Sequence, residues 1–166
     1  KRQLVEWGDP GPLQLDDDAT AIKGKLYAIS ALGSREVLNR ATGELVPVNN
    51  VNAPNAIDGI NYAPFAAFGG WAGAVNKGAD QKTKDAAYAF LSYLNQSAQS
   101  SVDVTIGATG YNPYRLSQLS SPDLFVKAGM PQALAENYIG AINGALNSLN
   151  MASDMKIPGS SCLRPC

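Results

Sequence analysis

Apolar residues recur with helical periodicity in the second half of the chain. Residues 81–96 place four apolar side chains on one helix face: Ala87, Phe90, Leu91 and Leu94. Asp80 directly precedes this segment and can accept a hydrogen bond from the first turn, so we predict that it is the N-cap. A second long helix is predicted over residues 131–151, where five residues share the spacing: Leu134, Tyr138, Ile142, Ala145 and Leu149. A short helix is expected over residues 97–104.

Other segments have the composition of β-structure. Residues 25–32 have strand character, and residues 72–76 predict a short strand. Residues 36–39 and 44–48 flank Ala41-Thr42-Gly43, which predicts a hairpin. Residues 49–62 are rich in Asn, Pro and Gly and should form a surface loop. Strands and helices without a regular βαβ rhythm predict an α/β lobe, with α+β as the alternative, in which a short mixed sheet is flanked by helices.

Length, composition and charge narrow the function classes. With 166 residues, of which 45% are apolar, the chain predicts a single globular lobe over 1–166. A net charge of −1 provides no basic field for nucleic acid. No apolar run approaches the roughly 20 residues that cross a bilayer, so we expect no direct membrane insertion.

The absence of histidine removes the commonest general base and metal ligand. Serine–histidine and cysteine–histidine nucleophiles are therefore excluded within this chain, and we expect neither an enzyme nor a cofactor. A carboxylate pair could still cleave glycosides, but no spacing selects two of the candidates: Asp9, Asp58, Asp103 and Glu136. Asp16-Asp17-Asp18 lacks the alternation of a calcium loop, which favours a solvated acidic segment and no metal.

Two further features concern the cellular compartment. Cys162 and Cys166 lie in a tail over residues 160–166, where they could pair with each other or with a segment outside the chain. Asn95-Gln96-Ser97 is a sequon whose Asn95 could carry a glycan in a secreted protein.

The segment Gly69-Gly70-Trp71 combines close backbone approach with a flat apolar ring. A short apolar segment and a helix follow it, which is the order expected of a recognition loop on a rigid scaffold. It lacks the lysine and hydroxyl residues of a phosphate-binding loop. These features predict recognition of a ligand without catalysis.

Several segments, in this order, resemble the second lobe of extracellular solute-binding proteins that serve ABC transporters, especially the sugar-binding ones. Trp7-Gly8-Asp9, residues 22–28 and Gly33-Ser34 resemble the family's tryptophan-containing strand end and its "V-K-G-K" run ending in "P-G-S", although Ala31-Leu32 stand where prolines are usual. Gly69-Gly70-Trp71, the "K-x-A-A-x-x-F-x-x-Y-L" helix at 84–94, the "G-x-x-P-x-R" loop at 110–115 and Ile157-Pro158-Gly159 continue the likeness.

The resemblance implies one lobe of a type II periplasmic-binding-protein-like fold, in an extracellular or periplasmic setting. These proteins have two lobes joined by a hinge, and the ligand lies between them. Nothing in these 166 residues resembles the first lobe, so that lobe or a partner protein would have to complete the cleft.

A sugar-like ligand would stack its C–H face on an aromatic ring and use polar groups for its hydroxyls. The candidate ligand-binding residues are Trp71, Gly69, Gly70, Trp7, Asp9, Arg115 and Tyr111. Each has another interpretation: either tryptophan could fill the core, Asp9 could cap a turn before Pro10 and Arg115 could form a surface ion pair or a hinge contact. Tyr114 could flank the same cleft.

Two functions remain as hypotheses. The chain could recognise a small solute as one lobe of a binding protein or receptor ectodomain. Alternatively, it could be a structural module of an extracellular complex whose fold serves protein–protein contact. Gly69-Gly70-Trp71 and Pro113-Tyr114-Arg115 favour solute recognition, whereas the missing first lobe and the altered "P-G-S" segment favour assembly.

Overall fold

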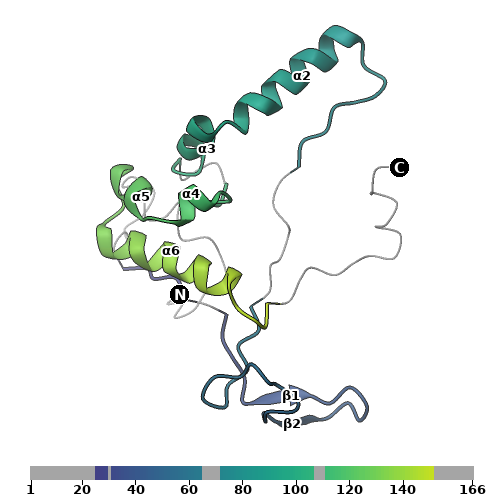
Figure 1. Cartoon of the computed structure of the whole chain (residues 1–166), viewed down its shortest axis with the longest axis vertical. Coiled ribbons are helices and arrows are strands. Elements are labelled where there is room, and N and C mark those ends of the chain that lie inside the picture. Colours follow the sequence, from purple (N-terminus) through teal and green to yellow (C-terminus); the bar gives the residue numbers. More distant parts are fainter. Residues whose placement is uncertain (1–24, 30, 65–71, 107–110, 152–166) are drawn as a thin grey trace, which may run out of the picture. The chain divides into compact units, whose positions relative to one another are not determined.

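The computed structural model describes residues 25–29, 31–64, 72–106 and 111–151. Within these ranges it contains five helices and one two-stranded sheet (Figure 1). The chain divides into two compact units, the first made of Lys1–Ala28 and Gly70–Ala141 and the second of Ile29–Gly69 and Ile142–Cys166. The solute-binding-protein-like lobe with a mixed sheet stays a prediction.

The first helix of the first unit is α2 (Gln81–Leu94). Its predicted N-cap, Asp80, is confirmed. The Asp80 carboxylate accepts from the Thr83 backbone N–H at 2.9 Å and from the Thr83 hydroxyl at 2.7 Å. The hydroxyl bond and then the backbone bond hold the pKa of Asp80 below its ordinary value of 3.8. This stabilisation is present above the pH at which an unfolded aspartate ionises and is lost as the pH falls through the lower, folded pKa.

The half-buried face of α2 differs from the predicted one by a single residue. Ala87, Leu91 and Leu94 are half-buried as expected, but Phe90 is exposed. The fourth half-buried residue of the helix is Lys84, which lies one turn before Ala87. The aliphatic stem of a lysine can cover apolar surface while its ammonium group stays in water. Phe90 lies beside the row formed by these four half-buried residues.

Three short helices and the part of a longer one up to Ala141 complete the first unit. The short helix predicted after α2 is confirmed as α3 (Ser97–Asp103). It is followed by α4 (Leu116–Leu119) and α5 (Asp123–Lys127), which the sequence did not predict because four or five residues are too few to show a period. Finally, α6 (Gln132–Leu146) supplies much of the apolar core.

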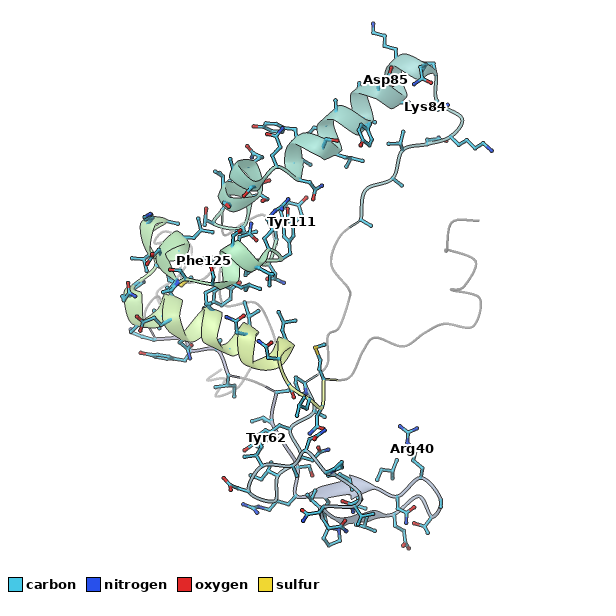
Figure 2. The ribbon with its side chains drawn as sticks, in the orientation of Figure 1. Arg40, Tyr62, Lys84, Asp85, Tyr111 and Phe125 are labelled. Carbon is cyan, nitrogen blue, oxygen red and sulfur yellow. The ribbon has the colours of Figure 1, made fainter. Side chains whose placement is uncertain are left out.

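The core of the first unit joins α5 to α6. The Phe125 ring, labelled in Figure 2, is fully buried. It meets the Tyr138 ring edge-to-face, with 5.4 Å between the ring centroids. The other buried apolar side chains of this unit are Val104, Leu119, Met130, Leu134, Ala135 and Ile139. Gly129 has a φ of 105° and allows the chain to turn between the two helices.

The last predicted helix is correct in place and face but ends earlier than expected, at Leu146 rather than residue 151. The Asn147 side chain donates to the Asn143 carbonyl at 2.8 Å, in addition to the bond from its own backbone N–H. Asparagine and serine side chains compete in this way for backbone groups, which favours termination. Leu149, predicted on the helix face, is therefore exposed beyond its end.

The predicted strand over 25–32 is wrong for its described residues, 25–29 and 31–32, which belong to no strand. The backbone of Ala28 pairs instead with a side chain of α6. Its N–H donates to Asn137 Oδ1 at 2.7 Å, and its carbonyl accepts from Asn137 Nδ2 at 3.0 Å. One amide side chain therefore pairs with this backbone in place of the neighbouring strand that a β-structure would require.

The predicted strand over 72–76 is also wrong, because this segment is irregular. It packs against α2 and pairs with no strand among the described residues. A Cβ atom on Gly73 would lie 2.4 Å from Leu91 Cδ2, which is far closer than carbon atoms can approach. Any larger residue at position 73 would therefore force the Leu91 side chain to move.

The second unit contains the predicted hairpin. Strands β1 (Glu36–Leu38) and β2 (Leu45–Pro47) pair antiparallel, with Val37 opposite Val46. In the connecting turn, which carries Arg40, the Asn39 side chain accepts from the Ala41 N–H at 3.0 Å (Figure 2). Gly43 supplies the positive φ of 77° that closes the loop.

Residues 49–62 consist of turns and short bridges without a helix or strand. Ile57 and Ile60 exchange two backbone hydrogen bonds of 2.9 Å across Asp58-Gly59. Both central residues have positive φ, 53° and 72°, as a two-residue type I′ turn requires. Asn150 donates to Asn61 Oδ1 at 3.0 Å and thereby ties the end of the described chain to this loop.

We predict that Phe125→Ala destabilises the chain by about 3–5 kcal/mol, because the change leaves a cavity beside Tyr138. Phe90→Ala provides a matched control, since Phe90 is 60% exposed and Phe125 is 0% exposed. The control should change stability by less than about 1 kcal/mol. Denaturant unfolding followed by circular dichroism measures both, and equal losses would contradict this description of the core.

Candidate functional site

The predicted site residues divide between described and undescribed parts of the chain. Trp7, Asp9, Gly69, Gly70, Trp71, Cys162 and Cys166 lie outside the described residues. Tyr111, Arg115 and Asn95 are described and belong to the first unit. Their surroundings lie at the junction of α2, α3 and α4, where Figure 2 shows Tyr111 beside α4.

Two buried polar side chains, Ser100 on α3 and Gln118 on α4, organise this junction. Each is 1% exposed. Gln118 Nε2 donates to Ser100 Oγ at 3.3 Å, and Ser100 Oγ in turn donates to the Ser97 carbonyl at 3.2 Å. A buried hydroxyl or amide without partners would cost free energy, so these bonds make burial of the pair acceptable.

Gln118 also shapes the loop that carries Arg115. Its Oε1 accepts from the backbone N–H groups of Tyr114 at 3.0 Å and Arg115 at 3.1 Å. Arg115 is the N-cap of α4 and Gln118 is its third helical residue. This is one half of a capping box, in which a Gln at that position reaches back to the N-cap backbone. The loop conformation at Arg115 thus depends on a buried amide.

The Arg115 side chain is half-buried and is fixed from one side. Its Nε donates to Ser100 Oγ at 3.0 Å, and its Nη2 donates to the Asn95 carbonyl at the end of α2. These two donors are neighbours on one edge of the guanidinium. The structure shows no partner for Nη1 among the described residues. The edge formed by Nη1 and the remaining Nη2 hydrogen is therefore available to an acceptor.

Tyr114 provides an aromatic surface next to this cation. The Arg115 guanidinium carbon lies 5.4 Å from the centroid of the Tyr114 ring, within the range of a cation–π contact. The Tyr114 side chain is 53% exposed. The predicted neighbour Tyr111 is also exposed, though less so. The structure thus brings together Arg115 and the exposed ring of Tyr114, which was predicted to flank the same cleft.

Asn95, the sequon residue, ends α2 and is exposed. Its Nδ2, the atom that a glycan would occupy, donates to the Leu91 carbonyl at 2.9 Å. Its own carbonyl accepts from Arg115. Glycosylation at Asn95 stays a prediction, and the structure adds a capping role for the same side chain.

Sequence reasoning missed Ser100 and Gln118, which hold Arg115 in place. A signal for Gln118 exists in the spacing, because a Gln three residues after an N-cap is typical of a helix start. No comparable signal marks Ser100, since its partners are 15 and 18 residues away.

The described part of the chain holds no group of three or more metal-ligating side chains and no helix of the length and apolarity that crossing a bilayer demands.

Comparison of the chain with protein-family models, with curated proteins and with solved structures finds no match.

We predict that Gln118→Ala lowers the free energy of unfolding by about 1–3 kcal/mol, because it leaves two loop N–H groups without their acceptor and removes one of the three hydrogen bonds of Ser100. Gln132→Ala is the matched control, since it removes only an exposed bond to Glu136. That control should stay within about 0.5 kcal/mol of the parent chain. Thermal and denaturant unfolding would test this difference, and a neutral Gln118→Ala would contradict the role of the network.

Proposed function

We propose that this chain recognises a small, sugar-like solute outside the cytoplasm, without catalysis, as one lobe of a two-lobe binding protein or receptor ectodomain. The observation that carries the proposal is the pair formed by Arg115 and Tyr114. Arg115 offers an unoccupied donor edge, and Tyr114 offers a ring that is more than half exposed. The ordered resemblance of the sequence segments supports the same function.

The chemistry of a sugar suits this pair. A pyranose ring presents an apolar C–H face that can cover an aromatic ring, and its hydroxyls accept hydrogen bonds from a guanidinium. The bonds from Arg115 to Ser100 and Asn95 fix the guanidinium before any ligand arrives. Binding then requires less ordering of this long side chain, which favours affinity.

The remaining recognition residues in this proposal are Trp71, Trp7, Asp9, Gly69 and Gly70, together with Tyr111. A second lobe or a partner protein would supply the opposite wall of the cleft. Closure of two lobes around a ligand excludes water and strengthens the polar contacts that one lobe makes alone.

The test is isothermal titration of the 166-residue chain with a panel of mono- and oligosaccharides. Tyr114→Ala should weaken binding by more than about 1 kcal/mol, as expected for an aromatic anchor, and Trp71→Ala should do the same. Tyr88→Ala is the control, because Tyr88 is an exposed tyrosine on α2, whereas the ring against Arg115 is that of Tyr114. Absence of saturable binding across the panel, or equal affinity of Tyr114→Ala and the parent chain, would contradict the proposal.

A second candidate function is assembly through protein–protein contact. The observation that favours it lies on α2, where Tyr88, Phe90 and Tyr93 are all exposed. Phe90 and Tyr93, three residues apart, share one face of the helix, whereas Tyr88 lies on another. Exposed aromatic side chains are typical of protein interfaces. In this alternative, α2 rather than the Arg115 loop carries the contact.

If copies of the chain assemble through α2, sedimentation velocity should show a mass that increases with concentration. Phe90→Ser should shift the equilibrium towards the monomer by about tenfold or more, because it removes an interface anchor. Tyr27→Ser is the control, since Tyr27 is equally exposed but lies outside α2. A chain that stays monomeric at all concentrations would contradict this form of the assembly hypothesis.

A further inference from the structure

We infer that the ligand bound at Arg115 carries a carboxylate, so that the sugar-like solute is an acidic sugar of the uronate class. This inference rests on the proposed function and specifies its ligand. The observations behind it are the charge of Arg115, the geometry of its open edge and the position of the Tyr114 ring.

The first argument is an unbalanced charge. An arginine guanidinium is always protonated in a protein. Within the described residues, all the partners of Arg115 are neutral: the Ser100 hydroxyl, the Asn95 carbonyl and the Tyr114 ring. No described Asp or Glu side chain forms an ion pair with it. A half-buried cation without a counter-ion is better compensated by an anionic ligand than by a neutral one.

The second argument is geometric. Nε and Nη2 form the side edge of the guanidinium, and that edge is already bound to Ser100 and Asn95. The end edge, formed by Nη1 and the second Nη2 hydrogen, presents two parallel N–H groups. This fork matches the two oxygens of a carboxylate, which can accept both bonds in one plane. A single hydroxyl would use only part of the fork.

The third argument selects a sugar acid among carboxylates. The Arg115 guanidinium carbon lies over one face of the Tyr114 ring, 5.4 Å from its centroid, so a ligand would meet the ring at its edge or on its opposite face. A uronate carries its carboxylate directly on the pyranose ring, so one small ligand can place its carboxylate on Arg115 and its C–H face on Tyr114. A carboxylate without a ring would leave the exposed aromatic surface unused.

The experiment compares matched sugars that differ only at C6. The parent chain is titrated with galacturonate against galactose and with glucuronate against glucose, at low and at high salt. The uronates should bind at least about tenfold more tightly, as expected for a charge-assisted bidentate contact. Salt should weaken uronate binding and leave binding of the neutral sugars unchanged, because it screens the ion pair.

Variants locate the preference. Arg115→Lys keeps the charge but loses the fork, and it should reduce the preference for the uronates severalfold. Arg115→Gln should abolish that preference. Lys127→Gln, an exposed cation at the end of α5, is the control and should leave it unchanged. If the Arg115 variants do not fold, the comparison of matched sugars and its salt dependence in the parent chain still decides the matter.

The outcomes separate this inference from the proposed function. Equal affinity for uronates and neutral sugars would overturn the inference and leave solute recognition intact. Tighter binding of glucose 6-phosphate than of glucuronate would overturn the carboxylate assignment in favour of a phosphate. Failure of every sugar to bind would overturn both.

Discussion

The hydroxyl of Ser100 is the group on which the rest of the α2–α4 junction depends. It accepts hydrogen bonds from Gln118 and Arg115 and donates one to the Ser97 carbonyl, so all its bonding capacity is used in a place with almost no access to water. Through Gln118 it fixes the loop before α4, and through Arg115 it reaches the end of α2. A local network of this kind is cooperative, since each bond holds the partner of the next.

This network holds a long, charged side chain in one position while leaving part of it without a protein partner. A long cationic side chain is adaptable but loses entropy when a ligand fixes it. Arg115 is fixed by the protein itself on one edge, and its other edge has no partner among the described residues. The adjoining core contributes rigidity, because the buried Phe125 ring meets the Tyr138 ring edge-to-face and so joins α5 to α6.

Local features of the fold could be predicted from the sequence, whereas contacts over long separations could not. The Asp80 cap and the β1–β2 hairpin depend on residues within a few positions of one another, and both are confirmed. The prediction of a strand over 25–32 is wrong because the Ala28 backbone bonds to the side chain of Asn137, which lies 109 residues away. No periodicity in the sequence reveals such a contact. The same holds for the candidate site. Arg115 could be predicted from its residue type and loop context. The roles of Ser100 and Gln118 could not, because they depend on contacts between α3 and α4 that the sequence does not reveal.

The pairing of Asn137 with Ala28 has a chemical consequence. One side-chain amide accepts from the N–H and donates to the carbonyl of the same residue, so the contact depends on its nitrogen as well as its oxygen. Deamidation would convert that amide to a carboxylate, which can only accept. The bond to the Ala28 N–H would survive, but the Ala28 carbonyl would then face a negatively charged oxygen. Hydrolysis of one amide, a change of one mass unit, would therefore turn an attraction into a repulsion and release this segment from α6.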